Sequence, residues 1–344
     1  MKRLLVSLLS CITLSLPAAA AVRLLPPGPD TRDTSAPTTP KLQGSVSRAA
    51  YDCLCGDAAY ATKTPQGFRD AVDWYTKALG VDPDYAAAHE GLGCAFIAQG
   101  KWQEAIAENR TAIRLNPDNP ATHSNLGTAL FNLHSLDEAI TEYQTAIRLS
   151  PDLANAHYNL GATFKAQGRL EEAITAYQAA IRLDPHYVDA HFGLGVALKS
   201  QGKVDEALTE YQTAIRLDPN HAMTHNNLGN VLHEQHRLAE AFAAYQMAIR
   251  LDPSYAIAHN NLGKFFYDQL RLDEAIVEYT TAIKLDPTYS RAHSNLGRVY
   301  YAQKKLDEAI AEFRTAVRLD PNDDCRQWLD KALAKKGKSP ELGR

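Results

Sequence analysis

The sequence predicts an all-α protein, an α-solenoid of stacked antiparallel helix pairs. Two observations lead to this prediction. A set of residues recurs every 34 positions, and the apolar residues within each period fit two amphipathic helices joined by a short polar turn. One helix pair of this size leaves an apolar face bare, so its stability has to come from stacking on its neighbours.

The first 21 residues have the order typical of a secretory signal peptide. A pair of basic residues at the start precedes an apolar stretch over residues 4–16, and alanines occupy positions 18–21. Such a leader is removed after the small residues, here after Ala20 or Ala21. We therefore expect residues 1–21 to be a signal peptide and the mature protein to be exported, either periplasmic or extracellular.

Two alternatives stay open for this leader. Without cleavage it would anchor the chain in a membrane. The run Leu8-Leu9-Ser10-Cys11 also has a faint resemblance to a bacterial lipobox, in which case Cys11 would carry a lipid and hold the protein at a membrane.

Two irregular segments come before the regular part of the chain. Residues 22–46 are rich in proline and threonine, a composition that cannot bury enough apolar surface to offset chain entropy, so we expect a disordered linker. Residues 47–85 are expected to form a divergent first repeat. Its second helix carries Phe68 and Tyr75 in the expected order, whereas its first helix, at about residues 47–60, lacks a Leu-Gly pair.

Seven regular repeats follow over residues 86–323. Four series of residues keep the period without a slip. They are the prolines from Pro117 to Pro321, the glycines of the Leu-Gly pairs from Gly93 to Gly297, and two alanine series, from Ala105 to Ala309 and from Ala112 to Ala316. Four registers that share one period indicate one structural unit.

Each repeat is predicted to contain two helices. In residues 120–153, Leu126 and Leu130 mark the apolar face of the first helix, and Ala139 and Tyr143 that of the second. The glycine of each Leu-Gly pair lets the two helices approach closely. The proline after the second helix ends it, and we expect the residue after the proline to cap the next first helix.

The chain is expected to end with a helix that covers the last repeat. Residues 324–335 form this capping helix, with Trp328 and Leu329 on its apolar side and Asp330 and Lys331 on its outer side. We expect residues 336–344 to be a disordered tail.

The repeated residues resemble the tetratricopeptide repeat, whose motif has Trp, Leu-Gly, Tyr, Ala, Phe, Ala and Pro in that order. Residues 86–323 follow this motif, except that histidine replaces the tryptophan and Asn109 stands where an aromatic residue is expected. The resemblance implies a right-handed superhelix in which the first helices line a concave groove. It also implies that the groove binds a protein or a peptide.

The residue before each Leu-Gly pair should then face the groove. In five repeats it is an asparagine: Asn125, Asn159, Asn227, Asn261 and Asn295. An amide has a donor and an acceptor, so a row of amides can pair with a peptide backbone whatever its side chains. This is similar to the asparagine ladder in the repeat arm of O-linked N-acetylglucosamine transferases. Gly91 and Gly193 interrupt the row, and the alternative is that asparagine is a tolerated, solvated residue there.

The last groove positions add basic and aromatic side chains: Lys264, Tyr267, Arg291, Arg298 and Tyr301. Asn230, Asn261 and Arg291 match three of the five residues of the carboxylate clamp in chaperone-binding members of the family. Asn226 and Asn295 stand where that clamp has basic residues. The resemblance therefore leaves open a weakened clamp for an acidic peptide or a peptide C-terminus.

Several other classes of protein are disfavoured. The formal net charge is −4, without the basic excess of a nucleic-acid-binding protein. No catalytic motif stands in its required context, and no transferase domain follows the repeats, so we expect no enzyme, no cofactor and no small-molecule substrate.

Seven histidines keep the same period: His89, His123, His157, His191, His225, His259 and His293. Side chains at equivalent positions of stacked helices are about 10 Å apart and point the same way, so they form a row and do not converge on one ion. We expect these histidines to be structural and expect no metal site. Metal binding or pH sensing is the alternative.

Four cysteines remain after removal of the leader: Cys53, Cys55, Cys94 and Cys325. In an exported protein they are candidates for oxidation. Cys94 lies on the helix beside the one that carries Cys53 and Cys55, so we expect a disulfide bond between Cys94 and Cys53 or Cys55. Cys325 lies at the other end of the stack.

The sequence thus favours a non-enzymatic exported scaffold that binds an extended peptide or protein segment in its concave groove. The alternative is an envelope assembly or adaptor protein that docks folded partners through its convex or end surfaces.

Overall fold

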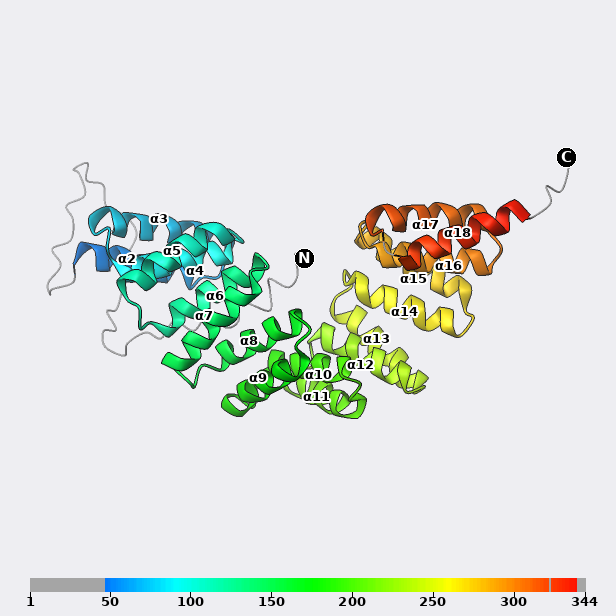
Figure 1. Ribbon diagram of the computed structural model, residues 1–344, viewed down its shortest axis with the longest axis horizontal. Helices are drawn as coiled ribbons and strands as arrows, with labels where there is room; N and C mark the ends of the chain where they lie inside the picture. Colours follow the sequence, from blue (N-terminus) through cyan, green and yellow to red (C-terminus); the bar gives the residue numbers. More distant parts are fainter. Residues whose placement is uncertain (1–46, 322, 339–344) are drawn as a thin grey trace, which may run out of the picture. The chain divides into compact units, whose positions relative to one another are not determined.

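The computed structural model describes residues 47–321 and 323–338 (Figure 1). This part of the chain contains seventeen helices and no strand, which confirms the predicted all-α class. The predicted signal peptide, residues 1–21, and the predicted linker, residues 22–46, lie outside the described residues. None of the helices in the described ranges has the length and apolar character needed to cross a bilayer.

The helices fall into two compact units, which meet in sequence at Pro185 and His186. The described helices of the N-terminal unit are α2 (Arg48–Tyr60), α3 (Pro65–Val81), α4 (Ala86–Ala98), α5 (Trp102–Leu115), α6 (Pro120–Asn132), α7 (Leu136–Leu149), α8 (Ala154–Ala166) and α9 (Leu170–Leu183). Those of the C-terminal unit are α10 (Val188–Ser200), α11 (Val204–Leu217), α12 (Ala222–Glu234), α13 (Leu238–Leu251), α14 (Ala256–Asp268), α15 (Leu272–Leu285), α16 (Ser290–Ala302), α17 (Leu306–Leu319) and α18 (Asp323–Lys338).

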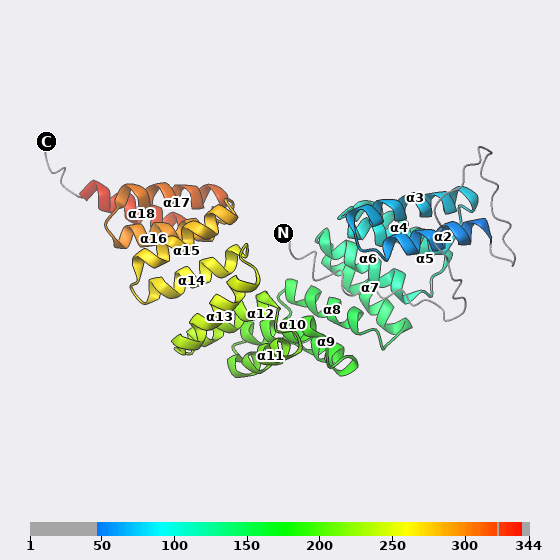
Figure 2. The same ribbon diagram turned by 180° about the vertical axis from the view of Figure 1, so that it is seen from behind.

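Within each unit, consecutive helices pack side by side as pairs (Figure 2). The even-numbered helix is the first of each pair from α2 to α16, and the odd-numbered helix is the second. First helices also contact the next first helix, as α4 does with α6 and α14 with α16. These contacts are the stacking that the bare apolar face of a single pair requires.

The distance between the two helices of a pair is set by a contact between glycine and an aromatic ring. A Cβ atom built on Gly127, Gly161, Gly195, Gly229, Gly263 or Gly297 would lie 2.6–2.9 Å from a ring carbon of the aromatic residue on the second helix of the same repeat. These rings, from Tyr143 to Phe313, are at most 1% exposed. The Leu-Gly pair is therefore a packing requirement, as the sequence predicts.

Asn109 takes the place of that ring in the first regular repeat. It is completely buried, and a Cβ atom on Gly93 would lie 2.5 Å from its amide nitrogen. Its Nδ2 donates to the carbonyl of Ala105 at 2.8 Å, but its Oδ1 has no hydrogen-bond partner. A buried acceptor without a partner costs about 1–3 kcal/mol, so this repeat is packed less favourably than the others.

The turn between the helices of a repeat needs a left-handed residue at one fixed position. Glycine supplies it at Gly100, Gly168 and Gly202, with φ between 71° and 82°. The same position is occupied elsewhere by His134, His236, Leu270 and Lys304, with φ between 59° and 63°. These four turns carry the modest strain of a side chain in the left-handed region.

The predicted capping of the first helices is wrong. The N-cap is one residue further along, for example Tyr255 and Tyr289, and among α4 to α16 only the Asn119 side chain accepts a capping hydrogen bond at the start of a first helix. The carboxylate before the proline closes the turn instead: Asp286 Oδ1 accepts from the backbone N–H of Thr288 at 2.9 Å. This Asx-type turn engages the residues after the proline before the helix begins.

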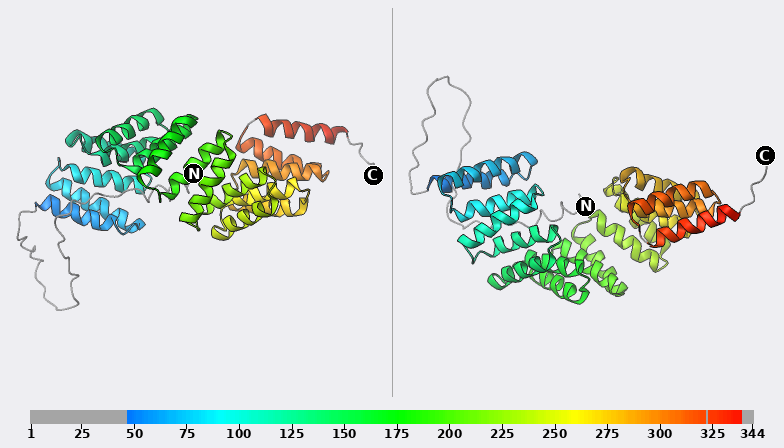
Figure 3. Two further views of the ribbon diagram at one scale, coloured as in Figure 1. Left: turned by 90° about the horizontal axis from the view of Figure 1, so that it is seen from below. Right: turned by 45° about the horizontal axis from the view of Figure 1, so that its top comes forward.

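The final helix is longer than predicted. Helix α18 runs to Lys338, so residues 336–338 are helical and the prediction of a disordered tail is wrong for them. Trp328 stacks on Phe313 with ring centroids 6.1 Å apart, and the Lys336 ammonium pairs with Asp307 of α17. Both views of Figure 3 show this helix, in red, along the last repeat.

The glycine contact predicts opposite effects of one substitution at two sites. Gly195→Ala should destabilise the α10–α11 pair by about 1–3 kcal/mol, because the new Cβ would lie 2.6 Å from the Tyr211 ring. Gly80→Ala on α3 should stabilise by about 0.5–1 kcal/mol, because nothing lies within 4 Å of its added Cβ. Hydrogen exchange measured by mass spectrometry should show faster exchange in α10 and α11 for Gly195→Ala alone. Equal protection in both variants would contradict the packing argument.

Candidate functional site

Asparagine side chains on three first helices of the C-terminal unit lie close to one another, and most of them are joined by hydrogen bonds. We call the side chains of α12, α14 and α16 at Asn226, Asn227, Asn260, Asn261 and Asn295 the amide face. Asn295 Nδ2 donates to Asn260 Oδ1 at 2.9 Å, and Asn261 Nδ2 donates to Asn226 Oδ1 at 2.9 Å. Asn260 Nδ2 lies 3.3 Å from Asn261 Oδ1 and joins the two bonds. One chain of amides therefore crosses three successive repeats.

Two members of this chain were not among the predicted site residues. Asn226 and Asn260 are 2% and 1% exposed, and each supplies the acceptor for the asparagine of the next repeat. The Asn-Asn pairs at 226–227 and 260–261 recur with the repeat period, which is the sequence signal that could have shown them. Their bonds hold the predicted Asn261 and Asn295 in fixed orientations.

The remaining hydrogen-bonding capacity of the amide face lies at two places. Asn227 is half-buried, and no described residue bonds its amide. Asn295 donates its Nδ2 within the chain of amides, but its Oδ1 has no partner among the described residues. Hydrogen bonds within the protein thus engage part of the predicted ladder. Among the ladder residues of this unit, Asn227 and Asn295 keep groups able to bond an incoming group.

The ladder residues of the N-terminal unit are more deeply enclosed. Asn125 is 7% exposed and its Nδ2 donates to Cys94 Sγ at 3.1 Å, while Asn159 is 6% exposed. Nearby, burial raises the pKa of Asp57 and of Glu90 above the usual carboxyl range. The ladder asparagines of this unit are therefore less accessible than Asn227 and Asn295.

Two of the three residues that match a carboxylate clamp have internal partners. Asn230 Oδ1 accepts from the hydroxyl of Tyr245 at 2.8 Å, and Asn261 bonds Asn226. Arg291 is exposed at the start of α16. A carboxylate accepts hydrogen bonds and therefore needs the amide donors. Asn261 Nδ2 is already engaged by Asn226, whereas Asn230 Nδ2 has no partner among the described residues.

Lys264 and Tyr267 lie beside the amide face on α14. The Lys264 ammonium is 3.6 Å from Asp268 Oδ2, and its side chain is 60% exposed, so the pair is weak and the cation is available. His233 approaches the same Asp268 carboxylate at 3.7 Å, and burial lowers the pKa of this histidine. Tyr267 is half-buried.

Arg298 and Tyr301 were predicted as groove residues, but both side chains contact Trp328 of the capping helix α18. The guanidinium carbon of Arg298 is 4.7 Å from the Trp328 ring centroid, and Tyr301 meets the same ring edge-on at 5.7 Å. Arg298 Nε is buried without a hydrogen-bond partner. The sequence places both residues on the first helix correctly but does not show how far α18 reaches over it.

Five of the seven periodic histidines pair with a glutamate of their own repeat. Nδ1 lies 2.6–2.7 Å from the carboxylate in the pairs His89–Glu108, His123–Glu142, His191–Glu210, His259–Glu278 and His293–Glu312. Where it is described, Nε2 of these rings faces the carbonyl of the proline six residues earlier, at 3.0 Å for His89. The pair thus ties the turn before the first helix to the second helix.

The histidines do not gather. His157 and His225 have alanine, Ala176 and Ala244, where the other five repeats have glutamate. Within residues 47–321 and 323–338, no group of three or more His, Cys, Asp or Glu side chains is arranged to hold a metal ion.

The predicted disulfide bond is not formed in the structure. Cys53, Cys55 and Cys94 are all free thiols. Cys53 and Cys94 do belong to one core cluster, and burial raises the pKa of the Cys53 thiol to about 12 and that of Cys94 further in the same direction. Buried, protonated thiols are poor nucleophiles, which keeps them reduced kinetically.

Stacked helix pairs joined by glycine–aromatic contacts define an α-solenoid repeat protein. A family model described as "TPR repeat" matches residues 93–134, 133–168 and 163–202, and a model described as "Tetratricopeptide repeat" matches residues 192–256, 226–289 and 260–324. Together they span most of the chain, so the chain belongs to the tetratricopeptide-repeat family, as the resemblance implies.

Solved structures with the same fold are only distantly related in sequence. The crystal structure of the APC/C hetero-tetramer Cut9-Hcn1 is similar with a TM-score of 0.63 and 20% identity, covering 81% of this chain and 58% of that one. Pseudomonas aeruginosa pilF is similar with a TM-score of 0.54 and 20% identity, covering 62% of this chain and 96% of that one. Such low identities show the fold alone. No curated protein sequence matches this chain.

Thiol burial predicts a definite order of alkylation. In the folded full chain, iodoacetamide at neutral pH should modify the half-buried Cys55 well before the buried Cys53 and Cys94, and denaturation should make all three reactive. Peptide mass spectrometry after timed quenching measures each site. Equal rates for Cys94 and Cys55 would contradict the burial argument. A pair that stays unmodified after denaturation without reductant would instead restore the disulfide.

Proposed function

We propose that this chain is a non-catalytic scaffold that holds an extended peptide, or an extended segment of a protein, against the amide face. The chain of hydrogen bonds from Asn295 to Asn226 is the observation that supports this proposal. Because these amides are fixed before any ligand arrives, little side-chain entropy is lost when they help to position one.

Backbone pairing is the mode of recognition that these groups favour. Asn227 offers a donor and an acceptor, and Asn295 offers the free Oδ1, which together match the N–H and C=O groups of a peptide backbone. The bond from Asn261 Nδ2 to Asn226 weighs against a clamp for a terminal carboxylate, because it engages a donor that the carboxylate would need. An internal segment of the partner is therefore favoured over its C-terminus.

The side chains around the amide face supply selectivity. Lys264 and Arg291 are exposed cations, and Tyr267 is a half-buried aromatic residue on the same helix as Lys264. They favour a segment that carries acidic side chains and at least one apolar side chain. Exposed charges of this kind mainly raise the association rate and select among partners.

Removal of the Asn227 amide and of the unpaired Oδ1 of Asn295 should weaken binding without unfolding the protein. Peptides selected on the full chain from a random displayed library should bind Asn227→Ala/Asn295→Ala about 5- to 100-fold less tightly, since each lost hydrogen bond contributes about 0.5–1.5 kcal/mol. Gln212→Ala/Gln246→Ala removes two exposed amides from second helices and should leave affinity unchanged. Fluorescence anisotropy measures both. Unchanged binding by the asparagine variant would favour the alternative, docking of folded partners through other surfaces.

We also propose that the scaffold works after export. The basic residues, apolar stretch and alanines of residues 1–21 support this. N-terminal sequencing of the protein isolated from its own cells should find Ala21 or Val22 first. Leu8→Arg/Leu9→Arg should retain the full-length precursor, because charges interrupt the apolar stretch. An intact Met1 on the wild-type protein in the cell interior would overturn the proposal.

A further inference from the structure

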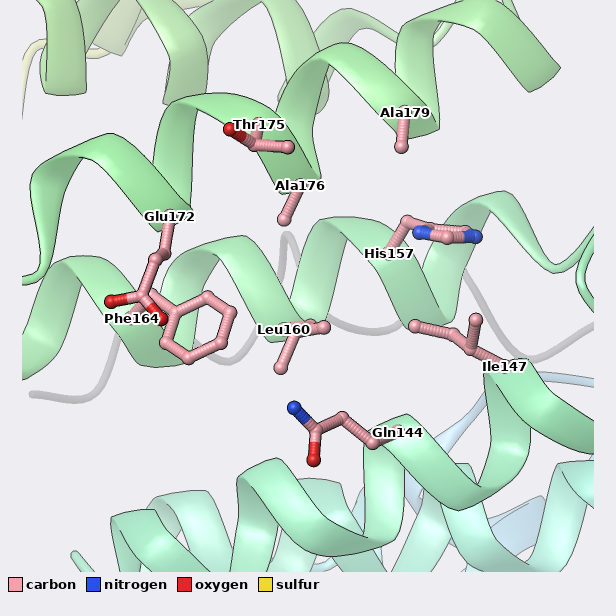
Figure 4. A pocket seen from close by; sticks show the side chains of 9 residues that line it. All are labelled: Gln144, Ile147, His157, Leu160, Phe164, Glu172, Thr175, Ala176 and Ala179. Carbon is pink, nitrogen blue, oxygen red and sulfur yellow. The ribbon is translucent and has the colours of Figure 1, made fainter.

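A cavity of about 370 Å³ opens in the N-terminal unit among helices α7, α8 and α9 (Figure 4). Its floor is apolar: Ile147, Leu160, Phe164, Ala176 and Ala179 line it. Four polar side chains complete the lining: Gln144, His157, Glu172 and Thr175. Leu160, Phe164 and Ala176 are buried, whereas Gln144, Glu172 and Thr175 are exposed, so the cavity has an apolar interior and a polar mouth.

Two small residues create this cavity. Five other repeats carry glutamate at the position of Ala176, and the same five carry threonine at the position of Ala179. In the repeat that contains Ala244 in place of glutamate, Met247 stands at the position of Ala179. The repeat of α8 and α9 therefore lacks side-chain volume at both positions. No other regular repeat has a small residue at both.

His157 is left with an unused nitrogen by the same change. Its Nε2 lies 3.1 Å from the carbonyl of Pro151, so Nε2 carries a proton and donates it. His157 lines the cavity, and its Nδ1 has no partner among the described residues (Figure 4). In the five repeats that keep glutamate, a carboxylate lies 2.6–2.7 Å from this nitrogen. These five repeats thus show that a carboxylate fits beside Nδ1 of the histidine.

We propose that this cavity binds a small carboxylic acid with an apolar body, whose carboxyl group takes the place of the missing glutamate at His157 Nδ1. The apolar body lies along Ile147, Leu160 and Phe164. One proton is shared between Nδ1 and a carboxyl oxygen, supplied either by the neutral acid or by the protonated ring. Burial of the apolar body contributes about 25 cal/mol per Å² of surface removed from water.

Glu172 does not oppose an acidic ligand at His157. Figure 4 shows Glu172 beside Phe164, at the end of the cavity away from His157. Its carboxylate pairs with the Arg169 guanidinium, whose carbon atom lies 4.4 Å from the Phe164 ring centroid. The charge of Glu172 is therefore balanced by Arg169 within the wall of the cavity.

Calorimetric titration of the full chain with octanoate tests the site. We expect saturable binding with one molecule per chain and at least tenfold weaker binding of octanamide, which has the same body but no carboxylate. Ala176→Glu should reduce octanoate affinity at least tenfold, because the restored side chain occupies Nδ1 as in five other repeats. The matched control Ala244→Glu places the same residue beside His225 and should leave octanoate binding unchanged.

A second variant keeps the test independent of an added charge. Ala179→Thr installs the residue of five other repeats and should weaken octanoate by narrowing the cavity. Circular dichroism checks that each variant is folded. The proposal is overturned if octanoate does not saturate the wild type, if octanamide binds as tightly, or if folded Ala176→Glu and Ala179→Thr bind like the wild type. None of these outcomes depends on peptide binding at the amide face.

Discussion

The packing of each helix pair depends on a contact between a glycine of its first helix and an aromatic ring of its second helix. At Gly195 the Tyr211 ring fills the space in which any other residue would place its Cβ, and the same contact recurs from Gly127 to Gly297. It fixes how closely two helices pack, and this in turn fixes where the next pair can lie. The outward-facing positions are thereby freed for other chemistry, because they take no part in holding the pair together.

That freedom explains why equivalent positions carry different side chains. The position before the Leu-Gly pair holds a bonded amide at Asn261, an unbonded one at Asn227 and a buried one at Asn125. The position opposite the periodic histidine holds glutamate in five repeats and alanine in two. One scaffold thus carries an amide face in its C-terminal unit and an apolar cavity in its N-terminal unit, each made by few substitutions.

The 34-residue period predicts the helix pairs, the class of fold and the role of the glycines, because these depend on contacts that every repeat makes. The period does not predict features that depend on a contact with a residue particular to one repeat or one turn. The orientation of Asn295 depends on Asn260, the starts of the first helices depend on aspartates before the prolines, and the fate of Arg298 depends on Trp328. The cavity at His157 could have been predicted by comparing the repeats position by position, since both missing side chains are visible in the sequence.

The long final helix also bears on polymerisation. A stack of identical helix pairs leaves an apolar face uncovered at each end. A head-to-tail contact between copies through these faces would generate an open filament. Helix α18 covers the aromatic surface of the last repeat with Trp328 and leaves Asp330 exposed. The Lys331 side chain is exposed too, although the sequence predicted it on the outer side and its ammonium lies 4.7 Å from the centroid of the Trp328 ring. A second copy that stacked on α18 would have to strip water from both charges, and this cost disfavours fibre growth through that surface.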